Sequence, residues 1–343
     1  MKNKKRPVWG RIVITIMLII IFIISVSIGY TYYQISKVST TKISKSNENL
    51  GIKPEVLKQI EERKVEEKKV EGGTEIINIA FFGVDRRFKN EPSRSDSIMV
   101  LTIDEKHKKI KMSSIMRDTY VNIKDHGMTK INHAYAYGGP ELAIRTLNEN
   151  FNLDIKNYVT VDFFNLESII NSLGGVRINV RADEIKIINS YMAEVGLLEK
   201  QSFKAVTSTG VLNLDGKQAV AYSRIRYTTG GDFERTERQR TVLSALLAKI
   251  QSAGELEFPI IAAKLLPYTE TSMSSIDIIK LGTAIFINNI KNLDQERFPV
   301  DGYCKGEMIG GVWYLVSNIE ATSSQMYKYI YEDKRPIAKI PLF

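Results

Sequence analysis

Arginine side chains are concentrated in one short segment, AYSRIRYTTGGDFERTERQR, at residues 221–240. A helix is expected after Asp232, which is placed to cap it and to add the helix amides to an anion site. Its apolar face includes Val242. Gln239 lies three residues before Val242, and Arg235 lies four residues before Gln239, so the helical period places both side chains on that same face. An arginine on the inward face needs an anion, either a ligand or a structural ion pair. Guanidinium groups suit phosphate oxygens, so this segment favours a phosphate or pyrophosphate site. Its arginines are Arg224, Arg226, Arg235, Arg238 and Arg240.

Two aspartates lie at the ends of strands that are expected to be neighbours. Asp85 follows directly on a buried strand, Ile76–Phe82, and Asp96 comes just before the strand that begins at Ser97. Ligands bind at strand ends in α/β sheets, and two carboxylates there suit Mg²⁺, which prefers oxygen ligands. Taken alone, Asp85 fits an Asx-turn or a cap better than a metal site.

A third charged group, Arg117–Asp118, ends the strand KIKMSSI. Arg117 either forms a salt bridge with its surroundings or reaches into the same cleft as the two aspartates. The residue pattern leaves both possibilities open.

The single cysteine, Cys304, has no histidine near it in the sequence to activate it, so we expect no catalytic thiol.

Short β-branched runs alternate with helical patterns after residue 75, where the folded part begins. IINIAFFG is closed by glycine and predicts a buried strand, and SIMVLTID and KIKMSSI flank a turn as a strand pair. The alternation predicts a layered α/β domain. The expected strands are 76–83, 97–104, 109–115, 157–163 and 176–180, and the expected helices are 141–151 and 165–175.

From Asp215 onward the pattern becomes more helical. No linker is visible within residues 75–343, which favours one domain, with a split near residue 215 as the alternative. The expected helices are 215–223, 233–252, 258–266, 276–292 and 323–332, with a late strand at 311–316.

The N-terminus predicts the compartment. Residues 12–33 are uncharged and apolar enough to cross a bilayer as a helix, and basic residues precede them. The positive-inside rule keeps residues 1–11 in the cytoplasm, which predicts a single-pass type II protein of the cell membrane. A cleaved signal peptide is the alternative, although the apolar run exceeds the usual length. Residues 34–73 are dense in charge and predict an extracellular stalk before a domain at 74–343.

The formal net charge of +9 is misleading as a sign of nucleic-acid binding. Five of these charges precede the apolar run, so 9 − 5 leaves only +4 for the rest of the chain. This balance argues against a nucleic-acid surface. One cysteine and three histidines exclude an intramolecular disulfide and do not fit a zinc site of the usual composition.

Seven motifs in a fixed order resemble those of the LytR-CpsA-Psr family over about residues 76–253. The family also shares the topology of a short cytoplasmic tail, one membrane helix and an outer domain. One departure is visible, because Met116 stands where the family usually has proline before the Arg-Asp pair. The motifs are FFGVDRR, RSDSIMVLTID, SSIMRDTYV, TKINHAYAYGG, SLGGVRINV, LDGKQAVAYSRIRY and GDFERTERQR.

The resemblance implies a central mixed β-sheet flanked by helices, with an apolar cavity for a prenyl chain. It implies a phosphotransferase that moves a glycopolymer, such as wall teichoic acid, from a polyprenyl-pyrophosphate carrier to a sugar hydroxyl of peptidoglycan. The implied cofactor is Mg²⁺, with Mn²⁺ as the alternative, and the implied metal ligands are Asp85 and Asp96. The implied pyrophosphate ligands are Arg117, Arg224, Arg226 and Gln239, supported by Arg235 and Arg238.

The resemblance also places Asp232 near the acceptor or the metal, and either Asp232 or Asp118 would take the hydroxyl proton. Two rival functions remain open. The first is a pyrophosphatase or phosphodiesterase, in which water replaces the sugar hydroxyl. The second is a non-catalytic receptor for anionic wall polymers, or a regulator. A transcription factor is excluded because eleven residues before the apolar run are too few for a DNA-reading element.

Overall fold

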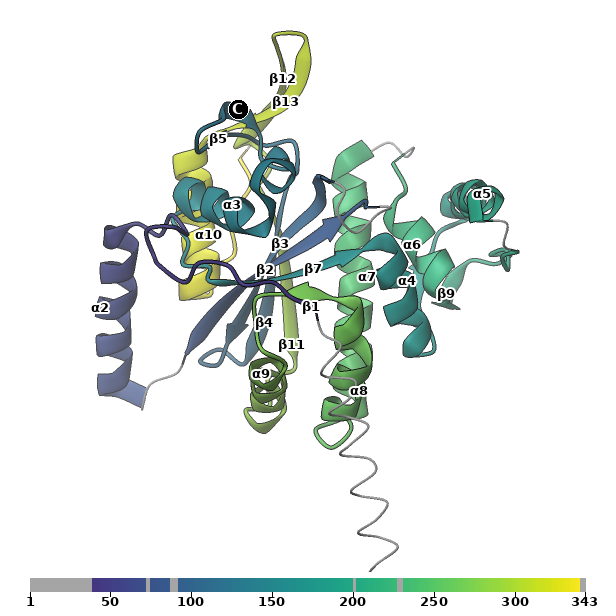
Figure 1. Ribbon diagram of the computed structural model, residues 1–343, viewed down its shortest axis with the longest axis horizontal. Helices are drawn as coiled ribbons and strands as arrows, with labels where there is room; N and C mark the ends of the chain where they lie inside the picture. Colours follow the sequence, from purple (N-terminus) through teal and green to yellow (C-terminus); the bar gives the residue numbers. More distant parts are fainter. Residues whose placement is uncertain (1–38, 72–74, 87–91, 200–201, 227–230, 340–343) are drawn as a thin grey trace, which may run out of the picture.

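A seven-stranded sheet forms the centre of the protein (Figure 1). The computed structural model describes residues 39–71, 75–86, 92–199, 202–226 and 231–339. The sheet is mixed, since β2 pairs antiparallel with β3 but parallel with β7, and β4 pairs antiparallel with β3 but parallel with β11. Its order is β1 (Ser39–Thr40), β10 (Glu270–Thr271), β7 (Asn157–Asp162), β2 (Ile76–Val84), β3 (Ser95–Asp104), β4 (Lys109–Ile115) and β11 (Asn292–Phe298).

Helices cover both faces of this sheet because its central strands are apolar on both sides. In β2, Phe82 packs in one core and Phe81 in the other, as the alternation of side chains along a strand requires. The first core lies under α2 (Pro54–Glu71), α3 (His133–Phe151) and α10 (Ile319–Glu332). The second lies under α4 (Phe163–Ser172), α5 (Ala182–Glu199), α6 (Gly216–Ser223), α7 (Gly231–Ala253) and α8 (Phe258–Leu265).

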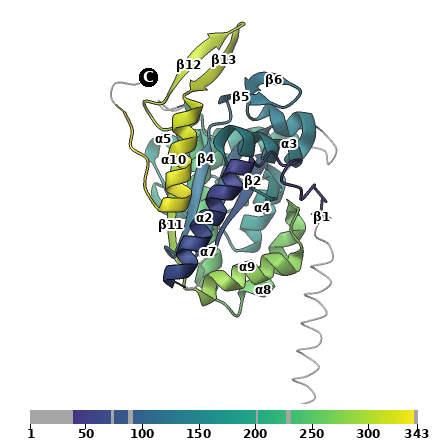
Figure 2. The ribbon, with the colours of Figure 1, turned by 90° about the vertical axis from the view of Figure 1, so that its left-hand side faces the viewer.

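Three two-stranded sheets, the 3₁₀ helix η1 (Leu266–Tyr268) and α9 (Ser275–Ile287) complete the described fold. Figures 1 and 2 show the hairpin β12–β13 at one end of the molecule and α8 with α9 at the other. The small sheets are β5 (Tyr120–Ile123) with β6 (Gly127–Lys130), β8 (Val176–Val180) with β9 (Gly210–Leu214), and β12 (Cys304–Ile309) with β13 (Val312–Ser317).

The predicted α/β layers are confirmed, and the misses are local. The expected helix through Asn292 ends at Ile287, because Asn289 takes a left-handed φ of 53° and turns the chain into β11. The strands β11 and β12 were not predicted, since NLDQERF and CKGEMI lack the apolar alternation of a strand. The predicted strand 176–180 forms, but it pairs with β9 outside the central sheet.

The stalk predicted for residues 34–73 is wrong over its described part. Leu50, Ile52, Val56 and Ile60 are buried in the core that contains Phe82. Ser39 and Thr40 pair with β10 in the central sheet. The prediction failed because α2 is mostly charged and presents only a narrow apolar edge. The folded domain therefore begins before residue 74, and α2 belongs to it.

The alternative of two domains split near residue 215 is also wrong. β10 and β11 come from beyond that position, yet both belong to the same sheet as β2, β3 and β4.

The predicted cytoplasmic tail at 1–11 and membrane helix at 12–33 lie outside the described residues. Among the residues that the structure describes, no helix is long and apolar enough to cross a membrane.

Candidate functional site

A polar cavity of about 220 Å³ lies where β2 ends and β3 begins. The main sheet, α4, α5 and α7 all contribute side chains to it, and so does the chain that follows α6. Most of the residues singled out in the sequence meet here. The cavity is lined by Asp85, Asp96, Phe163, Tyr191, Arg224, Arg226, Arg235 and Gln239.

Local geometry brings the two predicted carboxylates to the same cavity. Asp85 follows β2, and Asp96 is the second residue of β3 instead of preceding that strand. The two strands are antiparallel neighbours, with an irregular register at Gly83 and Val84. A side chain at Gly83 would place its Cβ only 2.9 Å from the Cβ of Ser97, so glycine permits this close approach.

Arg117 lies at the centre of a chain of ion pairs beside the cavity. Its Nη1 donates to Asp96 Oδ1 at 2.5 Å, and its Nε lies 3.6 Å from both Asp118 Oδ2 and Asp232 Oδ1. Burial lowers the pKa of Arg117, but the three carboxylates outweigh burial and hold the pKa above its ordinary value. Both alternatives stated for Arg117 are thus realised, since it forms salt bridges and lies next to the cleft.

Arg235 is the most confined cation of the site. It is 3% exposed, as expected for the inward face of α7, and its Nη2 lies 2.8 Å from Asp232 Oδ1. Its Nε is buried and has no hydrogen-bond partner among the described residues. Burial lowers the pKa of Arg235 to about 10, partly opposed by Asp232 and reinforced by Arg117 and Arg226. This crowding of cations is the electrostatic condition that an anion relieves.

The other two arginines of the cavity are held loosely. Arg224 Nη2 lies 3.8 Å from Asp85 Oδ2, and Arg226 Nε lies 4.0 Å from Asp232 Oδ1. Both distances exceed those of good hydrogen bonds, so these guanidinium groups keep donors for another anion. Arg224 also stacks over Phe163 at 5.0 Å and lies near the ring of Tyr191 at 5.9 Å.

Two sequence expectations are revised here. Asp232 does not cap α7 but lies in its first turn. Arg238 is absent from the cavity lining and instead contacts Glu184 Oε1 and Glu234 Oε2, each at 2.8 Å. Arg238 thus forms a buried structural ion pair, the alternative to a ligand for an inward arginine, and it holds α7 against α5.

Asp118 faces an unforeseen partner, Lys130 of β6, whose Nζ lies 2.8 Å from Asp118 Oδ1. Lys130 was visible in the motif TKINHAYAYGG, but its spacing gave no sign of this contact. The aromatic pair around Arg224 was missed as well. Tyr191 lies on α5, far from Arg224 in the sequence, and only the packing of α5 on α6 brings them together.

The LytR_cpsA_psr family model matches residues 31–330, which include all of these site residues. The chain belongs to the LytR-CpsA-Psr family. It is 31% identical over 332 residues to the polyisoprenyl-teichoic acid--peptidoglycan teichoic acid transferase TagU of Oceanobacillus iheyensis, covering 93% of this chain and 92% of TagU. It is also 34% identical over 227 residues to the regulatory protein MsrR of Staphylococcus aureus, covering 65% of this chain and 64% of MsrR.

Solved structures of the family share the fold. The structure of YwtF (TagT) of Bacillus subtilis with bound octaprenyl pyrophosphate lipid superposes with a TM-score of 0.56 and 29% sequence identity. The match covers 75% of this chain and 90% of that one. The central mixed sheet flanked by helices, expected from the resemblance, is therefore confirmed.

Met116, the departure from the usual family motif, is part of the core. It is 1% exposed and packs with Cys304 and Leu315. Its Sδ lies 3.6 Å from the Thr236 hydroxyl, one residue after Arg235. Met116 thus ties the strand end that carries Arg117 to the helix that carries Arg235.

A narrow apolar cavity of about 40 Å³ adjoins the polar one. Phe163 and Gln239 line both cavities. The rest of the apolar lining comes from the sheet on one side and from α4, α6 and α7 on the other, and includes Phe81, Met99, Val161, Leu166, Val242 and Leu243. A group with a charged head and an apolar tail matches this pair of cavities.

Proposed function

We propose that this chain transfers an anionic glycopolymer, wall teichoic acid or a similar polymer, from a polyprenyl-pyrophosphate carrier to peptidoglycan. The observation that carries this proposal is the buried Arg235, with an unpartnered Nε and a pKa lowered to about 10, beside an apolar slot. The names of its relatives support it, since TagU is named as such a transferase and TagT has been solved with octaprenyl pyrophosphate.

The pyrophosphate would replace the long ion pairs of the cavity. Arg224 and Arg226 lie 3.8 and 4.0 Å from their carboxylate partners, and phosphate oxygens would allow shorter, charge-assisted contacts. Gln239 lies one turn after Arg235 on α7 and lines the same cavity, where its amide can donate to an oxygen. Catalysis then rests mainly on positioning and charge neutralisation.

The two aspartates of the cavity fit a hard divalent cation. Mg²⁺ is usually held by one or two carboxylates together with substrate phosphates, and Asp85 and Asp96 supply that donor set on one cavity wall. Such an ion, Mg²⁺ or Mn²⁺, would neutralise charge on the phosphates. Because Asp96 already contacts Arg117, this arginine would share the carboxylate with the ion.

Asp232 is the better candidate for the proton acceptor. Asp118 Oδ1 is held by Lys130 Nζ at 2.8 Å, and Arg117 Nε lies 3.6 Å from Asp118 Oδ2. Asp232 Oδ2 has no hydrogen-bond partner among the described residues. The acceptor hydroxyl would give its proton to Asp232 while its oxygen bonds to the glycan-linked phosphorus. The bond from that phosphorus to the bridging oxygen breaks, and prenyl phosphate leaves.

The lipid tail would enter between the sheet and the helices. A cavity of about 40 Å³ is much smaller than the roughly 300–1,000 Å³ of ordinary ligand sites. The helices α4 and α7 must therefore move apart from the sheet to admit a prenyl chain. The apolar run at residues 12–33 would anchor the chain in the cytoplasmic membrane, with the described domain on the outer side.

The test is to incubate the full chain with a polyprenyl-pyrophosphate glycan, Mg²⁺ and peptidoglycan oligomers, and to analyse products by mass spectrometry. We expect glycan joined to peptidoglycan through a phosphodiester, dependent on metal. Arg226→Ala should lower the amount of this product by about 10²–10³-fold. Arg177→Ala, an exposed arginine of β8 away from the cavity, is the matched control and should retain it.

The rival functions give different products. Phosphorylated glycan released without transfer would identify a pyrophosphatase or phosphodiesterase. Tight binding of the lipid-linked glycan with no product under any metal would identify a receptor or regulator, the role that the name of MsrR suggests for that relative. Either result would overturn the transferase proposal.

A further inference from the structure

Helix α9 is an apolar helix that is hardly buried. Its sequence, SIDIIKLGTAIFI, contains one acidic and one basic residue, yet only Ser275 and Gly282 of its 13 residues are buried. Soluble helices usually turn such side chains into a core. An apolar surface of this kind marks a site of contact with another apolar partner.

The two sides of α9 differ in what they contact. Leu281 and Ile285 pack against Ile103 and Ile110 at the end of the central sheet. Ile276 and Ile287 lie eleven residues apart, about three helical turns, and therefore point the same way. They are 62% and 66% exposed and lie on the opposite side of the helix from Leu281 and Ile285.

The neighbouring helix α8 extends this surface. Phe258 of α8 packs directly on Gly282, where a Cβ would lie 1.9 Å from the ring, and contacts Phe286 in a tilted arrangement with 5.5 Å between the ring centroids. The two helices therefore pack directly on each other. On and just before α8, Ile260 and Leu256 are 55% and 92% exposed. The α8–α9 surface is defined as four exposed side chains on these two helices and just before α8: Leu256, Ile260, Ile276 and Ile287.

Strand β1 connects this surface to the N-terminal anchor. Ser39 pairs in parallel with Glu270 of β10, which lies between α8 and α9 in the sequence. Because the pairing is parallel, the chain enters β1 from the side on which Tyr268 and α8 lie. Five residues separate Ser39 from the apolar run that ends at Tyr33, and they reach at most about 20 Å.

We infer that the α8–α9 surface rests in the outer leaflet of the lipid bilayer. This inference depends on the proposed membrane anchor at residues 12–33, which would hold β10 and the adjoining helices within about 20 Å of the membrane. An amphipathic helix buries its apolar side chains about 5–10 Å into the boundary of headgroups and acyl chains. The hairpin β12–β13, at the other end of the molecule, would point toward the cell wall (Figure 2).

Charge does not drive this contact. Lys264, Lys280 and Lys291 are exposed on the segment, but so are Glu255, Glu257 and Asp277, and the formal charges cancel. Attraction to anionic lipids depends on net positive charge and is screened by salt. The contact should therefore depend on apolar area and should change little between low and high salt.

The experiment uses the full chain reconstituted in vesicles of phosphatidylethanolamine and phosphatidylglycerol that carry nitroxides on their acyl chains. Single cysteines at Ile276→Cys or Ile287→Cys, in a Cys304→Ser background, are labelled with an environment-sensitive fluorophore. Val312→Cys on β13 is the matched control, with an exposed apolar residue at the far end. We expect the labels at 276 and 287 to lose most of their fluorescence and the label at 312 to keep it.

Several outcomes would overturn the inference. Vesicle flotation without quenching at 276 and 287 would show an anchored protein whose α8–α9 surface is off the membrane. Stronger quenching at 312 would show the reverse orientation. Failure to float would remove the anchor and the inference together. None of these results depends on turnover, so loss of the proposed transferase activity would leave the inference standing.

A second readout links the surface to the site. The double variant Ile276→Glu/Ile287→Glu should lose most of its quenching, measured with a label at Ile260→Cys. It should also turn over vesicle-embedded substrate more slowly than the parent chain, while its rate on a short water-soluble prenyl analogue stays the same. Equal loss on both substrates would indicate damage to the fold instead of lost membrane contact, and would count against the inference.

Discussion

Two charged clusters flank the same strand, β4, and they are built in different ways. Arg117 follows the end of β4 and lies beside the cavity, where Arg224 and Arg226 contact carboxylates at 3.8 and 4.0 Å. Lys111 lies near the start of β4 in a second cluster, where Lys111 Nζ lies 2.6 Å from Asp104 Oδ2. The first cluster combines these long ion pairs with short ones from Arg117 to Asp96 and from Arg235 to Asp232, and is called the loose cluster. The second is called the tight cluster.

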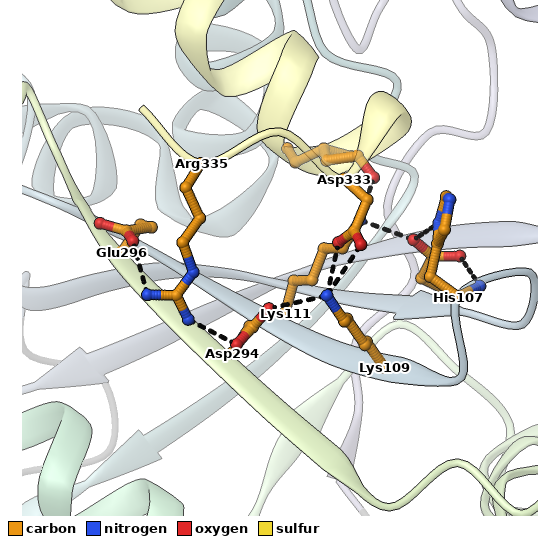
Figure 3. Close-up of polar contacts among 9 residues, drawn as sticks. His107, Lys109, Lys111, Asp294, Glu296, Asp333 and Arg335 are labelled. Carbon is orange, nitrogen blue, oxygen red and sulfur yellow. Dashed lines mark hydrogen bonds and ion pairs between the residues drawn. The ribbon is translucent and has the colours of Figure 1, made fainter. Parts of the chain in front are cut away.

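The second cluster joins four parts of the chain, as Figure 3 shows. Lys111 is fully buried and also lies 3.2 Å from Asp333, which follows α10. Lys109 contacts Asp333 and Asp294 of β11 at 2.7 and 3.2 Å. Every one of these distances allows a hydrogen bond, so the cluster fastens α10 and β11 to the hairpin β3–β4.

This tight cluster is not a metal site, although its geometry resembles one. Ligand atoms of Asp104, His107 and Asp333 lie within 4.8 Å of one another. The ammonium group of Lys111 already lies between two of these carboxylates, where a cation would bind. The pKa of Asp104 is lowered, since its hydrogen bonds and ion pairs with Lys111 and His107 outweigh burial.

The two clusters have different roles: the tight cluster stabilises the fold, and the loose cluster provides cations for a ligand. The tight cluster satisfies its own charges, and the pKa shifts favour its ion pairs. The cavity keeps its cations crowded, and the pKa of Arg235 is lowered by burial and by its arginine neighbours. A site that is electrostatically unsatisfied without ligand gains the most when an anion binds.

Breaking the tight cluster should have the largest effect. Lys111→Met leaves Asp104 buried without its main cation, and we expect the free energy of unfolding to fall by about 3–5 kcal/mol. Urea unfolding of the detergent-solubilised chain, followed by far-ultraviolet circular dichroism, measures this loss. Lys109→Met, whose side chain is 26% exposed, should cost only about 1 kcal/mol. Similar losses in both variants would contradict the distinction.

Breaking the loose cluster should damage activity instead. Arg226→Ala should lower transferase activity by about 10²–10³-fold, because a preorganised cation for the pyrophosphate is lost. Its free energy of unfolding should stay within about 0.5 kcal/mol of the parent chain, since its one carboxylate contact in the cavity is 4.0 Å long. A clear loss of stability would show that Arg226 is a structural ion pair.

Pyrophosphate bound in the loose cluster should stabilise the folded protein, mainly through Arg235. Inorganic pyrophosphate at about 100 times its dissociation constant should raise the free energy of unfolding by about 2.7 kcal/mol. Arg235→Met should remove most of this gain, measured as the difference between its free energies of unfolding with and without pyrophosphate. Equal stabilisation of both proteins by pyrophosphate would place the anion elsewhere.

Lowering the pH should destabilise the protein through the tight cluster, and the effect of a single carboxylate should be the smallest of those predicted. Asp104, Asp294 and Asp333 have lowered pKa values in the folded protein, so the stability they contribute is present above about pH 4. It is lost as pH falls through the folded pKa values. Asp294→Asn should flatten the fall in stability below pH 4 by about 1 kcal/mol or less. Glu307→Gln on the exposed hairpin is the control and should keep the slope of the parent chain.

Much of the site was predictable because its chemistry is local. The inward position of Arg235 and Gln239 follows from the period of α7, and the placement of Asp85 follows from the strand before it. Arg238 shows the limit of this reasoning. Its partner Glu184 lies 54 residues away on α5, so sequence spacing could not reveal the pair.

The segment at residues 39–71 shows a second limit. Its charged composition predicts a stalk, but a few apolar side chains such as Leu50 and Val56 complete the core under α3 and α10. The composition of a helix describes all of its side chains together. Burial depends only on the few side chains that face the rest of the protein. The same limit hid β11, a polar strand that pairs with β4 through its backbone.

The sequence by itself determined the layered α/β class, the order of the family motifs and the residue types that suit a pyrophosphate. These follow from local periodicity and from the chemistry of single side chains. Only the tertiary structure decided which charges meet, because ion pairs form between residues far apart in the chain. It placed Arg235 in the cavity and Arg238 in a structural pair, although both lie on the same helix only three residues apart.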